Sequence, residues 1–141
     1  MASIRAIPAG VPAAIHFRQA TRGQVILGNA HPHWVVADEV ALMHNGTLDM
    51  DLPEGSVDSD TTIFARGVLR PALSAQPGLL DSPEYAQALS ESIGPHNRMV
   101  LLRRDGRFVT LNEHIGRHAG EFWFSKDPAL AMQLSAARTP A

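Results

Sequence analysis

The sequence predicts an α+β domain whose strands pair mainly in the antiparallel sense. Strand-like stretches come first, two helix-like stretches follow, and strands and a last helix end the chain, which is the order of an α+β fold. The clearest local pattern is a hairpin, in which residues 98–102 and 107–111 flank a turn ending in Asp105-Gly106. With 141 residues, the chain is long enough to bury a core and is most simply one domain.

Short strands are expected in the first part of the chain, after an irregular lead-in over residues 1–12 that is rich in Pro and Gly. Residues 13–18 alternate apolar and polar side chains, as a half-buried strand does. Three further strands are predicted from β-branched and aromatic content, at residues 24–27, 34–37 and 40–43. The last of them leads into His44-Asn45-Gly46, and since Asn-Gly favours a tight turn, the simplest interpretation is a hairpin tip.

Two helices are expected between the acidic loop 49–59 and the hairpin. Ser59 or Asp60 can cap the first helix, because a short side-chain oxygen accepts a free backbone N–H, and Pro71 is expected to end or kink it. The second helix is marked by a capping serine, a proline in the first turn and a terminal glycine: Ser82, Pro83 and Gly94.

The end of the chain is predicted to hold one more strand and one more helix. The strand covers residues 121–124, and the helix begins at Asp127. Residues 136–141 form a frayed tail, so that the domain covers residues 13–135.

Composition excludes several classes of function. The net charge of −2 gives no reason to expect a nucleic acid or an anionic membrane as partner, and no apolar segment is long enough to span a bilayer. We expect a cytoplasmic protein. The chain holds no cysteine, so disulfides, thiolate metal sites and cysteine nucleophiles are excluded for it.

Two kinds of reactive site, a metal site and a hydrolytic triad, are only weakly indicated by the polar clusters. His31 and His33 could share a face and bind a metal with His44 or Asp60, but Pro32 fixes the loop between them and no clustered ligand pattern supports a site. Ser59 or Thr61 could be drawn into a hydrolytic triad, yet neither lies in a nucleophile-elbow pattern. We therefore predict no metal site and no cofactor.

A binding site for a zwitterionic amide fits the polar residues better. Arg18 could hold a carboxylate in a bidentate pair, and Asp60 could hold an ammonium group. The side chain of Asn45 and the backbone N–H of Gly46 could form an oxyanion hole. Taken singly, Arg18 is explained by a surface ion pair, Asp60 by a helix cap and Asn45-Gly46 by a turn. Together they suit an α-amino acid amide.

Four motifs in this order resemble the glutaminase domain of class II glutamine amidotransferases, which are N-terminal-nucleophile (Ntn) hydrolases. They are His16-Phe17-Arg18-Gln19-Ala20-Thr21-Arg22-Gly23, Asn29-Ala30-His31-Pro32, His44-Asn45-Gly46-Thr47 and Ser59-Asp60-Thr61. The similarity covers roughly residues 13–126, and it is strongest to the short amidotransferase-like proteins of phages and bacteria. It includes the hairpin and the sequence Trp123-Phe124-Ser125.

The resemblance implies an αββα sandwich of mainly antiparallel sheets that hydrolyses glutamine. By resemblance, Asn45 and Gly46 form the oxyanion hole. Substrate contacts would come from Arg18, Thr21, His31 and Asp60. The chain departs from the family at Arg22, where a histidine is usual, and in lacking the N-terminal cysteine nucleophile. It also has only about fifteen residues before His16, so we expect an N-terminally abbreviated form of the fold.

Without a nucleophile, we expect no catalytic residue and a catalytically inactive binding or scaffold module that retains a pocket for glutamine or a related amide. Two alternatives remain. Another polypeptide could supply the cysteine and the missing strands by pairing with an open sheet edge, which makes the chain part of a split glutaminase. The chain could also be a structural subunit, such as a phage virion component.

Overall fold

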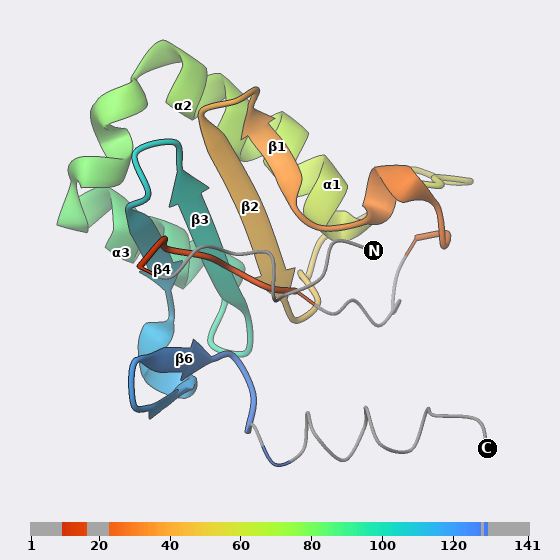
Figure 1. Ribbon diagram of the computed structural model, residues 1–141. Helices are drawn as coiled ribbons and strands as arrows, with labels where there is room; N and C mark the ends of the chain where they lie inside the picture. Colours follow the sequence, from red (N-terminus) through yellow and green to blue (C-terminus); the bar gives the residue numbers. More distant parts are fainter. Residues whose placement is uncertain (1–9, 17–22, 128, 130–141) are drawn as a thin grey trace.

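The computed structural model describes residues 10–16, 23–127 and 129 (Figure 1). A four-stranded antiparallel sheet lies at its centre, in the order β1-β2-β3-β4. Its strands are His33–Val36 (β1), Val40–Asn45 (β2), Arg98–Arg103 (β3) and Phe108–Leu111 (β4). A second, two-stranded sheet pairs Arg117–Ala119 (β5) with Phe122–Phe124 (β6). The predicted α+β class with antiparallel strands is confirmed.

Helices cover one face of the four-stranded sheet (Figure 1). They are α1 (Asp60–Phe64), a π-helical turn η3 (Ala65–Leu69), α2 (Arg70–Ala75), the 3-10 helix η4 (Pro77–Asp81) and α3 (Pro83–Ile93). Two shorter 3-10 turns are η2 (Leu27–Asn29) and η5 (Glu113–Ile115). Strand residues that alternate toward these helices, such as Leu42 and Leu101, are fully buried with Leu69 and Leu73 in the core.

The opposite face of the sheet carries an apolar row that crosses all four strands. The strand register places Trp34, Ala41, Leu102 and Phe108 side by side. The inner Ala41 is buried, whereas Trp34 and Phe108 at the two ends of the row are exposed. Segment 10–16 runs along this face in front of β2 and β3 (Figure 1). This face therefore has a different covering from the helical one.

The elements with strong local signals form where they were predicted. Ser82 caps α3 by accepting a hydrogen bond from the Tyr85 N–H, and Gly94 ends the helix at a φ of 78°. The β3–β4 hairpin and β6 also match the predicted positions, as do β1 and β2 within one or two residues.

Two predicted strands near the N-terminus are wrong where the structure describes them. Residues 13–16 do not pair as a strand, and residues 17–18 lie outside the described part. Residues 24–27 form bends and the start of η2, because their backbone is bonded by Val57 and by the side chain of Asn29 instead of by a neighbouring strand.

Of the two outcomes predicted for Pro71, ending or kinking the helix after Ser59, the structure excludes the first. Helical backbone continues to Ala75 through the π-helical turn, in which the Arg70 N–H bonds the Ala65 carbonyl five residues back. The wider turn ends two residues before Pro71. In a regular α-helix, the proline ring would clash with the carbonyl four residues back. The helix expected from Asp127 falls on residues of which only Asp127 and Ala129 are described.

His44-Asn45-Gly46 is not a hairpin tip. Strand β2 continues through Asn45, whose partner in the ladder is Arg98 of β3 and not the segment that follows it in sequence. Gly46, at a φ of 144°, then leads the chain out of the sheet and toward α1.

Candidate functional site

Segments from all four polar motifs meet around the N-terminus of α1. Ser59 is the N-cap of this helix, and its hydroxyl accepts a hydrogen bond from the Thr62 N–H at 3.2 Å. Ser59, Asp60, Thr61 and Thr62 are all buried. Buried polar groups need partners, and here the partners come from the other motifs.

Asn29 joins the second motif to this helix start. Its side chain is fully buried, and its Oδ1 accepts from the Ser59 N–H at 2.7 Å and from the Thr62 hydroxyl at 2.9 Å. Its Nδ2 donates to the carbonyls of Gln24 and Val57 at 2.9 and 2.7 Å. One asparagine thereby uses both ends of its amide to hold two loops and a helix terminus together.

Gly23, the last residue of the first motif, packs against the same place. At its φ of 73°, a Cβ would lie 2.8 Å from the Ser59 nitrogen and 3.0 Å from Asn29 Nδ2. There is no room for a side chain, and the backbone conformation favours glycine. Arg18 and Thr21 of this motif lie outside the described residues.

His44 joins the third motif to α1 from inside the protein. Its Nδ1 lies 2.7 Å from the Thr61 hydroxyl and its Nε2 lies 2.9 Å from Asn97 Oδ1. Burial lowers the pKa of His44, against the opposing effects of the hydrogen bond to Asn97 and the charge of Asp60. The neutral ring then donates from Nε2 to Asn97 and accepts at Nδ1 from Thr61.

Asp60 clamps the loop that leads into the helix. Its Oδ2 accepts from the Leu48 N–H at 2.7 Å, and its Oδ1 accepts from its neighbour's N–H at 2.8 Å. The residue is 4% exposed. The carboxylate predicted to hold an ammonium group is therefore also a structural tie between the third and fourth motifs.

Asn45 and Gly46, the predicted oxyanion donors, lie at the end of β2 beside this network. The Asn45 side chain is half-buried, and its Nδ2 donates to the Ser125 hydroxyl at 2.7 Å. A Cβ on Gly46 would overlap Asn97 Oδ1, so the glycine allows the backbone to pass directly against this side chain. Asn97 is itself held by donating to the Ile93 carbonyl at 2.6 Å.

His31 lies in a group of three histidines. Its ring centroid is 4.0 Å from that of His16 and 4.7 Å from that of His33, with edge-to-face geometry in both pairs. In the described part of the chain, no three His, Asp or Glu residues are arranged to hold a metal ion. The second motif is thus joined to α1 through Asn29, while His31 packs against the first motif through His16.

The long-range contacts of several residues in this network are not predictable from the sequence. Asn29 and Thr61 belong to recognised polar clusters, but nothing local indicated that they bond across 30 and 17 residues. Asn97 carried no local indication at all. In the sequence, Ser125 only ends the run Trp123-Phe124-Ser125, whereas the structure brings it to Asn45.

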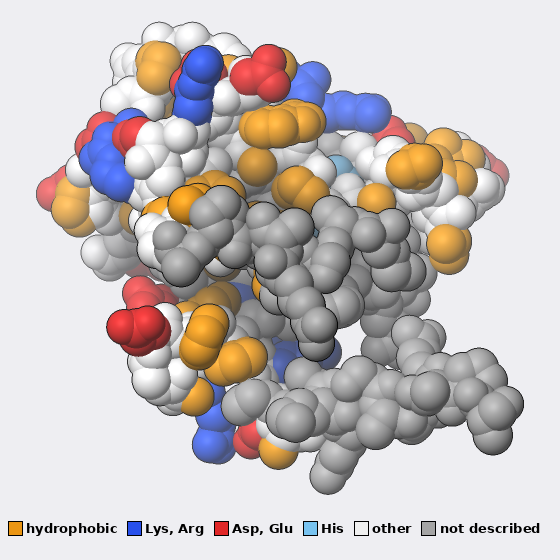
Figure 2. All heavy atoms as spheres, viewed as in Figure 1, with side chains coloured by type: hydrophobic (Ala, Val, Ile, Leu, Met, Phe, Trp, Pro, Cys, Tyr) orange, Lys and Arg blue, Asp and Glu red, His pale blue; other side chains and the backbone are white. Residues whose placement is uncertain are grey.

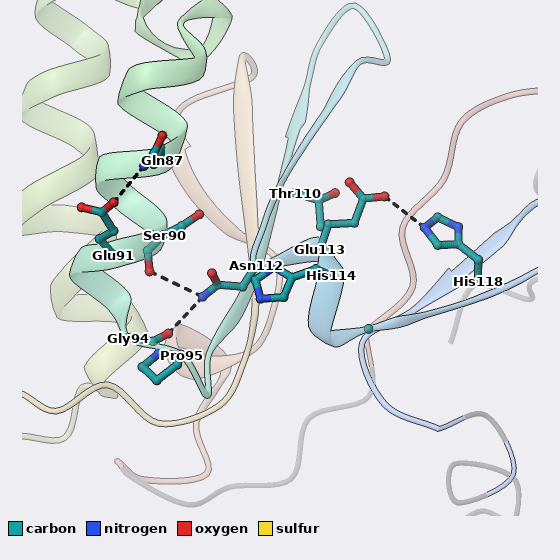
Figure 3. A pocket seen from close by; sticks show the side chains of 11 residues that line it. Gln87, Ser90, Glu91, Gly94, Pro95, Thr110, Asn112, Glu113, His114 and His118 are labelled. Carbon is teal, nitrogen blue, oxygen red and sulfur yellow. Dashed lines mark hydrogen bonds and ion pairs between the residues drawn. The ribbon is translucent and has the colours of Figure 1, made fainter.

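A cavity outside this network is a separate feature. It has a volume of about 900 Å³ and lies between the second half of α3 and the η5–β5 segment (Figure 3). Asn112 closes one side by donating to the Gly94 and Asn97 carbonyls, and Glu113 pairs with His118 at 3.1 Å. None of the four motifs contributes to its lining.

Fold and site together define an antiparallel α+β domain with a buried polar network at one helix N-terminus. In sequence, the chain is similar to a protein of Agrobacterium fabrum (strain C58) named glutamine–fructose-6-phosphate aminotransferase [isomerizing], with 29% identity over 119 residues. The match covers 84% of this chain and 17% of that protein, so the chain spans about a sixth of its relative's length. No known protein family and no solved structure matches the chain. No helix among the described residues is long and apolar enough to cross a membrane.

Proposed function

We propose that the chain is a glutamine amidotransferase-like domain of the Ntn-hydrolase type that binds glutamine or a related amide without hydrolysing it. The observation that supports it most is the convergence at Ser59 and Asp60. Gly23, Asn29 and His44 belong to three separate motifs, and each contacts this helix start or is hydrogen-bonded to it. The similarity to an aminotransferase whose name includes glutamine points to the same class.

The chemistry of the pocket follows from its donors and charges. The Asn45 amide and the Gly46 N–H would donate to the side-chain carbonyl of the ligand, and Arg18 would pair with its α-carboxylate. Asp60 already accepts two backbone N–H groups and, at 3.4 Å, the Thr61 hydroxyl, yet a carboxylate has about four lone-pair sites, so capacity remains for an ammonium group. Thr21 and His31 would form the wall.

Binding would not lead to hydrolysis, because this chain holds no cysteine to attack the amide carbon. The donors of an oxyanion hole can hold the carbonyl of an intact amide, but they lower the barrier to hydrolysis only when a nucleophile adds to that carbonyl. The role of such a domain would be recognition, as a binding or scaffold module.

The direct test is a thermal shift with L-glutamine at millimolar concentration. We expect a rise in the melting temperature of the wild-type protein, since a ligand that binds only the folded state stabilises it. The rise should disappear in Asn45→Ala and in Arg18→Ala and remain in Arg107→Ala, which changes an exposed arginine of the β3–β4 turn. Absence of any shift contradicts the proposal.

A glutaminase assay tests the inactive half of the proposal. The purified chain should release no ammonia from glutamine. Turnover that Asn45→Ala abolishes would show an active enzyme instead.

The split-enzyme alternative is supported by the face of the sheet opposite the helices of the described residues. Trp34 and Phe108 are exposed at the two ends of the apolar row, on the edge strands β1 and β4. A partner that supplied a cysteine and further strands would cover them. This alternative predicts a stable complex on co-expression with such a partner, glutaminase activity in the complex, and loss of the complex in the double variant Trp34→Lys and Phe108→Lys.

A further inference from the structure

The hydrogen bond between Asn45 and Ser125 links two distant parts of the chain. Asn45 ends β2, and Ser125 directly follows β6, eighty positions later in the sequence. At 2.7 Å between Nδ2 and Oγ, this is a short bond for an amide donor. Asn45 is the side chain to which the proposed function assigns the oxyanion contact.

Ser125 is held in place by its own hairpin. Two residues before it, the Trp123 indole N–H donates to the Glu113 carbonyl at 3.1 Å. The indole lies directly over Gly116, where a Cβ would overlap the ring. Strands β5 and β6 pair His118 with Trp123. The hairpin is therefore anchored on η5, and the backbone leaving it carries Ser125 to Asn45.

An asparagine amide has two N–H groups and one oxygen, and rotation about its last bond interchanges the two ends with little preference. In the structure the Ser125 hydroxyl oxygen accepts from one N–H of Asn45, which leaves the second N–H for another acceptor. We propose that Ser125 is a positioning residue that orients the Asn45 amide, so that its second N–H is directed at the carbonyl oxygen of an amide ligand. This inference rests on the proposed function for the identity of the ligand.

The orientation is tested in the free protein by ¹H–¹⁵N NMR of the side-chain amides. The Asn45 pair of signals is identified by its loss in Asn45→Ala. In Ser125→Ala the bonded proton should move upfield and the two signals should approach the values of an unrestrained amide. Ser125→Thr, which keeps a hydroxyl, should leave them near their wild-type positions. The Asn29 amide, held by its own four bonds, is the internal control and should not change.

The ligand-directed part is tested by titrating the same variants with L-glutamine. Ser125→Ala should weaken binding about two- to tenfold, which corresponds to one neutral hydrogen bond, and Ser125→Thr should restore it. Equal melting temperatures for the free variants would show that folding is not the cause. Tighter binding by Ser125→Ala would overturn the inference, because it would mean that Ser125 competes with the ligand for Asn45.

The two hypotheses fail in different ways. A wild-type protein that binds no glutamine overturns the proposed function and the ligand-directed part of this inference. Unchanged Asn45 signals in Ser125→Ala overturn the positioning role itself, whatever the ligand is.

Discussion

Polar side chains gather in two regions of the molecule, the buried network at the start of α1 and the exposed turn between β3 and β4. In the first region, neutral amides, hydroxyls and an imidazole bond one another, and Asp60 is the one carboxylate among the partners described above. In the second, Arg103 and Arg107 pair with Asp81 and Asp105 at the surface. Acidic and basic side chains lie next to one another along this rim of the molecule (Figure 2).

The two regions differ in their exposure to solvent. An exposed ion pair exchanges contacts with water at little net gain, whereas a buried donor that loses its partner has no water to replace it. The hydrogen bond from Arg103 lowers the pKa of Asp81, followed by the charges of both arginines, yet these groups remain open to solvent. The buried network should therefore determine stability and orientation, and the surface cluster should contribute little to either.

The substitution expected to destabilise the buried network most is Gly46→Ala. The new Cβ would overlap Asn97 Oδ1 at a backbone φ of 144°, so overpacking and backbone strain add. We expect a loss of about 2–5 kcal/mol in the free energy of unfolding, measured in urea. Gly55→Ala is the matched control, because Gly55 also has positive φ but nothing within 4 Å of a Cβ, and it should cost only about 1–2 kcal/mol. Equal losses would show that Asn97 moves aside freely.

Asn29→Ala should have the next largest effect. It leaves the buried Ser59 N–H without its acceptor and removes one of the two donors to each of the Gln24 and Val57 carbonyls, and a buried group left unsatisfied costs about 1–3 kcal/mol. We expect a total of about 2–4 kcal/mol by urea unfolding, with some relaxation. Gln87→Ala removes an amide of the surface that bonds Glu91, and it should change stability by less than about 0.5 kcal/mol. A comparable loss in both variants would contradict the distinction between the regions.

What the sequence predicted correctly depends on local interactions. Helix α3 is bounded by Ser82, Pro83 and Gly94, and the hairpin is specified by its own turn, so neighbouring residues suffice. The prediction for the end of strand β2 is wrong for the opposite reason. Its Asn-Gly pair is a local turn signal, but pairing of Asn45 with Arg98, more than fifty residues away, keeps the strand going.

The candidate site shows the same division. Its members were visible as polar clusters, because polar residues at strand ends are conspicuous. The hydrogen-bond partners of these residues are not recognisable in the sequence. Asn97 and Ser125 reach the site only because β3 and β6 place them there, and the residues around them in the sequence contain no local trace of that contact.

Protonation of His44 should make the contribution of the buried network to the free energy of unfolding depend on pH. Its pKa in the folded protein is lowered from the ordinary 6.5, so the unfolded chain binds the proton more readily. The free energy of unfolding should therefore fall as the pH drops below about 6.5, by up to about 1.4 kcal/mol per pH unit, until the pH reaches the lowered folded pKa. Urea unfolding between pH 7.5 and 5 measures this slope.

Matched variants assign that slope to its residue. His44→Gln should lower stability at neutral pH and remove its share of the pH dependence. His118→Gln, which changes an exposed histidine paired with Glu113, should keep the wild-type slope. If both variants keep that slope, the dependence arises elsewhere.

Asp81→Asn should give the smallest effect, although it removes the carboxylate that both arginines of the surface cluster share. The exposed guanidinium of Arg107 returns to water, and Asp105 remains as a partner both for it and for the half-buried Arg103. We expect a barely measurable loss of stability that disappears at about 1 M salt, where charges are screened within about 3 Å. The loss in Asn29→Ala should persist at the same salt concentration, since buried neutral hydrogen bonds are not screened. A salt-independent loss in Asp81→Asn as large as that of Asn29→Ala would mean that the β3–β4 turn is held by the same kind of bond as the start of α1.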